Sequence, residues 1–137
     1  MRLQKATRCA LYAILELASD PKRQLSANEI AEKYDISTNH LAKVLRSLGR
    51  EGLVEAVRGA GGGYRFSGNA KRTTLLDVIG LFETVETVSA GEREPGDETA
   101  EGLALTQVTM EIEAIERATF NSITLDTMLK LVGRYRK

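Results

Sequence analysis

Polar and basic side chains recur between residues 37 and 65 at spacings that suit contacts with a nucleic acid. Four consecutive polar residues open this stretch: Ser37, Thr38, Asn39 and His40. Basic residues follow at intervals of three and four and then around a run of glycines: Lys43, Arg46, Arg50, Arg58 and Arg65. Hydroxyl, amide and imidazole groups can read base edges, whereas lysine and arginine bond to phosphate oxygens. The pattern therefore predicts a surface that binds a polyanion.

The formal net charge of the chain is zero, but its two halves carry opposite charges. Residues 1–72 contain 13 basic and 7 acidic residues, a net +6, and residues 73–137 contain 6 basic and 12 acidic residues, a net −6. Three of the basic residues stand at the start of the chain and are expected to reach phosphates as well: Arg2, Lys5 and Arg8. The basic half favours a polyanion as partner, although for any single side chain an ordinary solvated charge is the alternative.

The composition offers little for catalysis or for metal binding. The chain has one histidine, His40, and one cysteine, Cys9. It therefore provides no pair of nucleophile and base and no multi-cysteine zinc site. The glycines of residues 59–63 are not followed by the Lys-Ser/Thr of a phosphate-binding loop, nor do they open a helix. We expect no enzyme activity, no metal and no cofactor.

Cys9 has two interpretations. It shares an apolar helical stripe with Ala6, Ala10 and Ala13, which favours a small residue of the core. The alternative is a redox sensor whose pKa is lowered by the neighbouring basic residues.

Two helices and a hairpin are predicted to position the polar and basic side chains. Ser26 is a helix N-cap, with Glu29 three residues later as in a capping box, and Asp35 lies in the tight turn before the next helix. Ser37 caps that helix and Gly52 ends it, and strands flank the glycine tip of residues 58–63. This order of elements is that of a winged helix-turn-helix, which lays a helix in the major groove of DNA.

The fold class is therefore mainly α with a small β-wing, followed by a long helix. A first helix over residues 5–19 and a fourth from Thr73 or Thr74 to about Val85 complete a DNA-binding domain of residues 1–85. Residues 86–102 are predicted to be an acidic flexible loop, and residues 103–137 a dimerisation helix and a C-terminal helix. The predicted dimer interface steps along one helix face at intervals of three and four: Leu105, Val108, Ile112 and Ile115.

The chain resembles the Rrf-two (Rrf2) family of bacterial winged-helix regulators over nearly its whole length. The matching blocks are residues 1–3, the wing of residues 53–64 with its Val57-Arg58-Gly59 and Gly61-Gly62-Gly63-Tyr64, and residues 121–125. The resemblance implies a homodimer joined through the helix of residues 103–121, bound to a near-palindromic operator and acting in most cases as a repressor. It also implies that Arg58 enters the minor groove, where narrow A·T-rich stretches attract cations.

The chain departs from the members that carry an iron–sulfur cluster. The positions of their three cysteines fall on Gly91, Asp97 and Leu103, and that of an auxiliary histidine on Thr106. One carboxylate cannot replace three thiolates, so we expect a colourless protein. Where those members place a base-reading glutamate, this chain has Ala42, which can touch a thymine methyl but cannot accept from cytosine. The operator is expected to differ at that base pair.

Two functions from different classes remain open on the sequence. The first is a sequence-specific dimeric transcription regulator that responds to a small molecule or to thiol oxidation; its ligand would lie between the fourth helix, the acidic loop and the long helix. The second is a winged-helix adaptor that binds proteins without specific DNA binding. The lack of a long apolar run and of a secretory signal leads us to expect a cytoplasmic protein that does not span a membrane.

Overall fold

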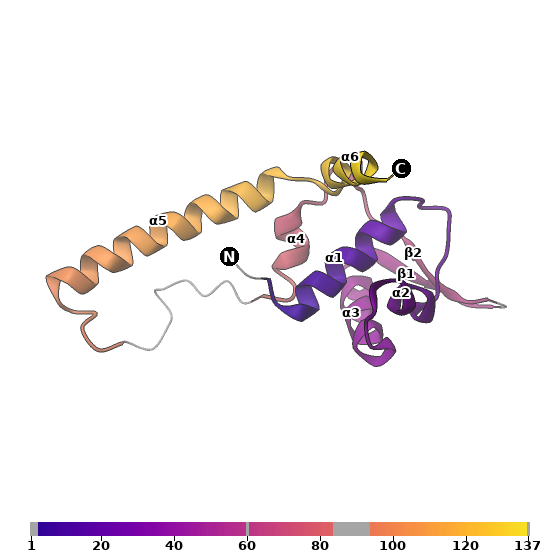
Figure 1. The fold of residues 1–137 in the computed structure, drawn as a ribbon, viewed down its shortest axis with the longest axis horizontal. Helices are drawn as coiled ribbons and strands as arrows, with labels where there is room; N and C mark the ends of the chain where they lie inside the picture. Colours follow the sequence, from indigo (N-terminus) through magenta and orange to yellow (C-terminus); the bar gives the residue numbers. More distant parts are fainter. Residues whose placement is uncertain (1–2, 60, 84–93, 137) are drawn as a thin grey trace.

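The computed structural model describes residues 3–59, 61–83 and 94–136, and within them it contains six helices and one two-stranded sheet (Figure 1). The elements are, in chain order, α1 (Lys5–Ala18), α2 (Ala27–Tyr34), α3 (Thr38–Arg50), β1 (Val54–Val57), β2 (Gly63–Phe66), α4 (Leu75–Ile79), α5 (Ala100–Ser122) and α6 (Leu125–Tyr135). The predicted fold class, mainly α with a small β-wing, is confirmed.

Helix α1 lies at the centre of the molecule and contacts α2, α3, α4, α6 and β2. Its inward face carries Ala10, Ala13, Ile14 and Leu17, none of which is exposed to solvent. The alanines let the neighbouring helices approach closely, while Ile14 and Leu17 fill the space between them. This helix is therefore the support on which the helix-turn-helix and the wing rest.

The helix pair α2–α3 forms as the sequence predicts. The Ser26 hydroxyl accepts from the backbone N–H of Glu29 at 3.0 Å, and the Ser37 hydroxyl accepts from that of His40 at 3.3 Å. Asp35 has the left-handed backbone expected of the tight turn, with φ 53°. The apolar face of α3 is buried against α1: Leu41, Val44, Leu45 and Leu48. The opposite face of α3 is left to solvent.

The wing is an antiparallel hairpin in which Val54 pairs with Phe66 and Val57 with Gly63. A short third segment pairs with it, because Leu25 forms a bridge with Tyr64 on β2. Gly63 is required there, since a Cβ atom at this position would lie 2.4 Å from the carbonyl oxygen of Leu25.

Helix α4 is shorter than predicted. The Thr74 hydroxyl caps it in a capping box with Asp77, as expected, but the helix ends at Ile79 rather than near Val85. From Gly80 the chain tightens into turns: Leu81 N–H bonds to Val78 O at 3.1 Å and Phe82 N–H to Ile79 O at 3.1 Å. Glycine is a poor helix former, so Gly80 favours an end of the helix at this point. Residues 84–93, which include the first eight residues of the predicted acidic loop, lie outside the described residues.

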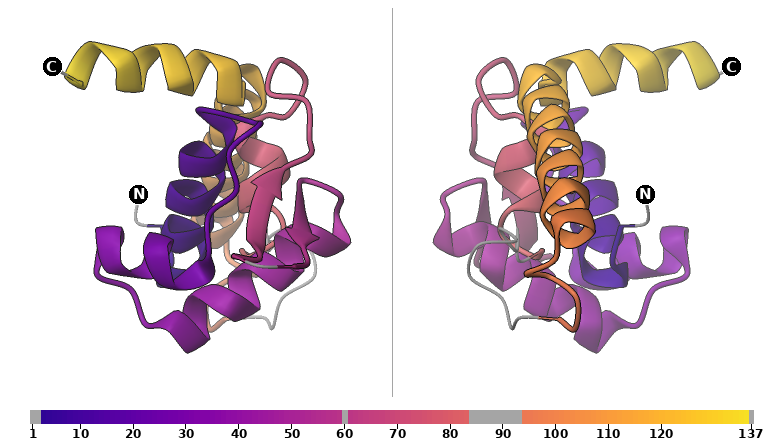
Figure 2. Two further views of the ribbon diagram at one scale, coloured as in Figure 1. Left: turned by 90° about the vertical axis from the view of Figure 1, so that its right-hand side faces the viewer. Right: turned by 90° about the vertical axis from the view of Figure 1, so that its left-hand side faces the viewer.

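Helix α5 begins at Ala100, earlier than the predicted residue 103, and extends away from the other helices along the longest dimension of the molecule (Figure 1). None of its described side chains is buried. Helix α6 lies at the end of the molecule opposite α3 (Figure 2), and its Leu125 is part of the core. Backbone bonds fix the α5–α6 junction to the start of α4, with Leu75 N–H to Ile123 O at 2.8 Å and Leu125 N–H to Thr73 O at 2.9 Å. Among the described residues, no helix is long and apolar enough to cross a membrane.

Candidate DNA-binding surface

The N-terminal end of α3 presents the polar residues expected to read bases. Ser37, Thr38 and Asn39 are exposed. Thr38 is held in place from α2, because its hydroxyl bonds to the side-chain oxygen of Asn28 at 3.3 Å. Asn28 is itself exposed beside this helix end, and no pattern in the sequence points to it, since the contact depends on the crossing of the two helices.

His40 is less exposed than the three polar residues before it. The side chain is half-buried, and its Nε2 atom is enclosed without a hydrogen-bond partner in the described part of the chain. This enclosure limits how far the imidazole can reach toward a base.

The basic residues of α3 lie on its solvent side, as predicted: Lys43, Arg46 and Arg50 are exposed. Arg50 bonds to the hydroxyl of Ser47 on the preceding turn at 3.1 Å. The opposite face of the helix is in the core, so these cations are on the one side that a duplex could approach.

The wing presents Arg58 directly after β1, and its side chain is exposed. The backbone around it has left-handed glycines, with φ 115° at Gly59 and 76° at Gly61, so the chain can turn back within a few residues. Arg65 is also exposed, but it forms an ion pair with Glu55 across the two strands. A phosphate would have to compete with that carboxylate.

The predicted contacts at the start of the chain are only partly described. Lys5 and Arg8 are exposed on α1, and Arg2 lies outside the described residues. The guanidinium of Arg8 donates to the hydroxyl of Tyr12 at 2.8 Å and lies 5.8 Å from the centre of its ring. The ring of Tyr12 in turn stacks on that of Tyr34, with 4.9 Å between ring centres.

Cys9 is in the core, with 4% of its surface exposed. Burial raises the pKa of its thiol, and this outweighs the lowering by the charges of Lys5 and Arg8. Because the thiolate is the reactive form, these properties favour the interpretation as a core residue over the sensor.

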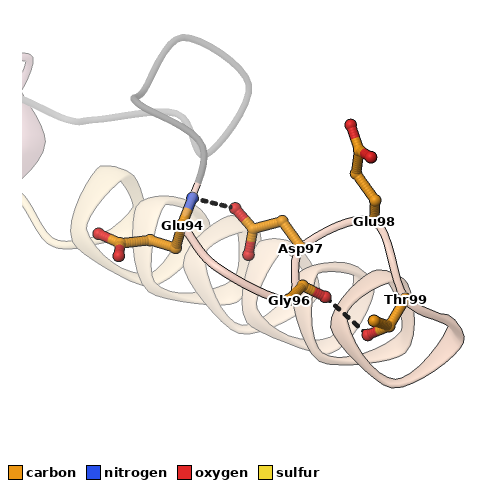
Figure 3. Close-up of a pocket in the computed structure, with 5 residues that line it drawn as sticks. All are labelled: Glu94, Gly96, Asp97, Glu98 and Thr99. Carbon is orange, nitrogen blue, oxygen red and sulfur yellow. Dashed lines mark hydrogen bonds between the residues drawn. The ribbon is translucent and has the colours of Figure 1, made fainter.

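The segment before α5 is acidic and turns around a hollow of about 360 Å³ lined by Glu94, Gly96, Asp97, Glu98 and Thr99 (Figure 3). The Asp97 carboxylate accepts from the backbone N–H of Glu94 at 2.7 Å, and the Thr99 hydroxyl donates to the carbonyl oxygen of Gly96 at 2.6 Å. The side chains of Asp97 and Thr99 thus bond to the loop itself. Among the described residues the lining of this hollow comes from the loop alone, whereas the ligand site expected from the sequence would also be lined by α4 and the long helix.

A family model described as "Rrf2: Iron-dependent Transcriptional regulator" matches residues 3–131. A curated relative named as an HTH-type transcriptional regulator, BadM, from Rhodopseudomonas palustris is 53% identical over 137 residues, which is 100% of this chain and 86% of BadM. The chain belongs to the Rrf2 family. It is accordingly a DNA-binding transcription regulator and not an enzyme.

Solved structures of other regulators share the fold. IscR of T. potens has a TM-score of 0.80 at 23% identity, covering 100% of this chain and 92% of IscR. CymR, the global cysteine regulator of B. subtilis, has a TM-score of 0.76 at 24% identity, covering 96% of this chain and 98% of CymR. At these identities the likeness extends to the winged-helix fold alone.

The iron in the description of the Rrf2 family does not suit the donors of this chain. Iron–sulfur clusters need thiolates, and the chain's one cysteine is buried on α1. Of the positions aligned with the family cysteines, Gly91 lies outside the described residues, Asp97 bonds to its own loop, and Leu103 is an exposed apolar side chain. Within the described ranges, no three histidine, cysteine or carboxylate side chains gather to hold a metal ion.

Proposed function

We propose that this Rrf2-family protein is a homodimeric repressor that binds a near-palindromic operator without an iron–sulfur cluster. The observation that carries the proposal is the pairing of two exposed features: the polar start of α3 and Arg58 on the wing. In a winged helix the first reads bases in the major groove and the second follows the minor groove or backbone. A regulator of this kind acts where the chromosome lies, so we place it in the cytoplasm.

Helix α5 supports the homodimer. The four side chains of its predicted interface are from 51% to 69% exposed in the single chain: Leu105, Val108, Ile112 and Ile115. A second copy of the helix would cover this seam, and the two-fold symmetry of such a dimer would place two α3 helices on the two halves of a near-palindrome.

The signal is proposed to be a small molecule, because the buried Cys9 is poorly suited to rapid oxidation. The polar groups of the loop before α5 do not define the ligand's chemistry. Thiol oxidation stays the second candidate.

The test is selection of binding sites from random-sequence DNA, followed by gel shifts of the recovered duplex at graded salt. The wild-type protein should lose affinity steeply as salt rises, through counterion release. Arg58→Ala should weaken binding by about tenfold or more. The matched control is Arg72→Ala, in the loop between β2 and α4 that bonds to α6 through Ala70 O and Asp126 N–H at 2.9 Å.

Two results would contradict the proposal. Recovery of no preferred duplex would favour the adaptor, which binds proteins only. Equal affinities for Arg58→Ala and Arg72→Ala would remove the wing from the DNA interface.

A further inference from the structure

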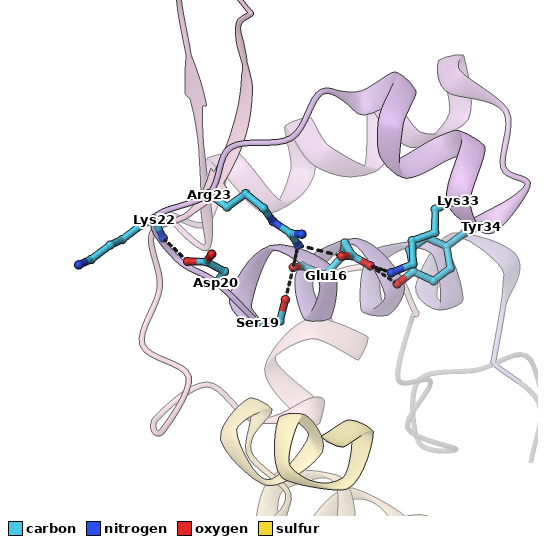
Figure 4. Close-up of polar contacts among 7 residues, drawn as sticks. All are labelled: Glu16, Ser19, Asp20, Lys22, Arg23, Lys33 and Tyr34. Carbon is cyan, nitrogen blue, oxygen red and sulfur yellow. Dashed lines mark hydrogen bonds and ion pairs between the residues drawn. The ribbon is translucent and has the colours of Figure 1, made fainter. Parts of the chain in front are cut away.

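The loop between α1 and α2 bonds both to a buried carboxylate and to the tip of the wing. The Arg23 guanidinium donates to the Glu16 carboxylate at 2.8 Å and to the Glu16 backbone oxygen at 2.9 Å (Figure 4). The side-chain amide of the next residue, Gln24, donates to the carbonyl oxygen of Gly61 at 2.8 Å. Two adjacent residues of this loop thus bond to different parts of the molecule: Arg23 to the buried Glu16 on α1, and Gln24 to the tip of the wing.

The backbone of this loop is also paired with the wing. Leu25 N–H bonds to Tyr64 O at 2.9 Å, and Tyr64 N–H bonds to Leu25 O at 2.7 Å. The absence of a side chain at Gly63 permits this approach. Residues 23–25, which we call the brace, therefore contact the hairpin through both backbone and side chain.

The tip of the wing lies beyond the paired strands, and within the described residues a backbone bond from Gly62 N–H to Gly59 O at 2.9 Å closes it. The last pair of the hairpin ladder is Val57 with Gly63, so Gly61 and Arg58 lie beyond the paired strands. Two-stranded hairpins are marginally stable by themselves, and glycines enlarge the range of conformations that a tip can adopt. The bond from Gln24 to Gly61 holds this tip to the loop before α2.

The far end of the brace is connected to the recognition helix. The Glu16 carboxylate that accepts from Arg23 also accepts from Lys33 at 2.6 Å and from the hydroxyl of Tyr34 at 2.6 Å (Figure 4). Both residues end α2, which leads directly into the turn before α3. The Glu16 carboxylate thus connects the brace, which contacts the wing, to the end of α2, which leads into α3.

We propose that the brace sets the position of the wing relative to α3, and that Gln24 is a positioning residue for Arg58. The inference rests on the proposed DNA-binding function. A wing held in its binding position before DNA arrives loses less conformational freedom on binding, so the brace strengthens the complex without touching DNA.

The experiment is a double-mutant cycle of Gln24→Ala and Arg58→Ala, with affinity measured for the duplex recovered with the wild-type protein. Gln24→Ala should weaken binding by roughly three- to tenfold, the range expected for one hydrogen bond. In the Arg58→Ala background the same change should have little further effect, because the group that it positions is gone. The control, Gln107→Ala, makes the same chemical change on α5 and should leave the affinity unchanged.

A second measurement needs no DNA. Amide hydrogen exchange at Gly61, Gly62 and Tyr64 should be faster in Gln24→Ala than in Gln107→Ala, while exchange in α1 stays the same. A merely structural role would instead lower the protection of the whole domain.

The outcomes separate the two proposals. Suppose that the wild type binds its duplex and that Arg58→Ala weakens this binding, but that Gln24→Ala has the same affinity as Gln107→Ala. The proposed role of the brace is then wrong, and the proposed DNA-binding function is retained. An equal loss from Gln24→Ala in both Arg58 backgrounds also overturns the brace. If no duplex is bound specifically, the proposed DNA-binding function is wrong. Unchanged amide exchange at the wing in Gln24→Ala would then contradict the proposed role of the brace as well.

Discussion

At the scale of single residues, the buried carboxylate of Glu16 has more hydrogen-bond partners than its position on an apolar helix face suggests. Burial by itself would raise the pKa of Glu16, but hydrogen bonds from Lys33, Tyr34 and Arg23 outweigh it and lower the pKa to about 2 from the usual 4.5. For Tyr34, burial and the bond to Glu16 both raise the pKa of the phenol. The cluster is thus held as a carboxylate with a neutral tyrosine and two cations.

We predict that Glu16→Gln destabilises the protein by about 2 kcal/mol at pH 7, since hydrogen bonds to a buried charge are lost. A carboxyl group whose pKa is lowered by folding stabilises the fold above its unfolded pKa. This contribution is lost as the pH falls from about 4.5 to about 2. Urea unfolding at pH 7 and pH 3 should therefore show a smaller pH dependence in the variant.

The control for this prediction is Glu55→Gln on the wing. Its ion pair with Arg65 joins side chains that are 46% and 49% exposed, so the change should cost less than about 1 kcal/mol. If Glu16→Gln and Glu55→Gln lowered the free energy of unfolding equally, the burial of Glu16 would not account for the loss of stability.

Cys9 gives a second prediction at this scale. Because its thiol is buried and its pKa is raised, it should react slowly with a thiol reagent in the folded protein and rapidly in urea. Cys9→Ser should destabilise the fold by about 1–3 kcal/mol through an unsatisfied hydroxyl. Fast labelling of the native protein, or oxidant-sensitive DNA binding that this variant abolishes, would restore the sensor interpretation.

At the scale of elements, the wing depends on a close backbone approach at Gly63. We predict that Gly63→Ala destabilises the protein by about 1–3 kcal/mol, because the added Cβ would meet Leu25 O at 2.4 Å and force the two segments apart. Chemical unfolding measures the loss, and amide exchange at Tyr64 should rise with it.

The matched change for this prediction is Gly133→Ala on α6. A Cβ atom at Gly133 has no neighbour within 4 Å, and alanine favours helix, so this variant should be neutral or more stable by up to about 1 kcal/mol. A loss at Gly133 as large as at Gly63 would show that the contact with Leu25 is not the cause.

At the scale of the whole molecule, the exposed apolar side chains of α5 form the proposed dimer interface. We predict that Ile112→Glu raises the dimer dissociation constant by about a hundredfold or more, since a charge would be buried in an apolar seam, and that operator affinity falls with it. Sedimentation at several concentrations measures the first effect, and gel shifts measure the second.

Gln107→Glu provides the comparison, because it introduces the same charge on the same helix at an exposed residue that is not one of the four predicted interface residues. It should sediment as the wild type. A wild-type protein that remains monomeric at micromolar concentration would rule out the α5 dimer.

Local features of the structure were determined by the sequence alone. The caps at Ser26, Ser37 and Thr74 and the left-handed Asp35 all formed as predicted, because each depends on residues within one helical turn. The same applies to the buried stripe of α3, whose spacing leaves Lys43, Arg46 and Arg50 on the outer side. The wing and the polar start of α3 could therefore be predicted from the sequence without a structure.

Contacts between distant segments were decided only by the tertiary structure. Gln24 and Gly61 are 37 residues apart, and nothing in their local sequence pairs them; packing of α1 against β2 brings them together. Nothing in the local sequence marks Glu16 as buried, yet Arg23, Lys33 and Tyr34 surround it in the fold, and packing likewise encloses Nε2 of His40. Helix periodicity specifies which face is buried, but the groups that meet a buried face depend on how the helices cross.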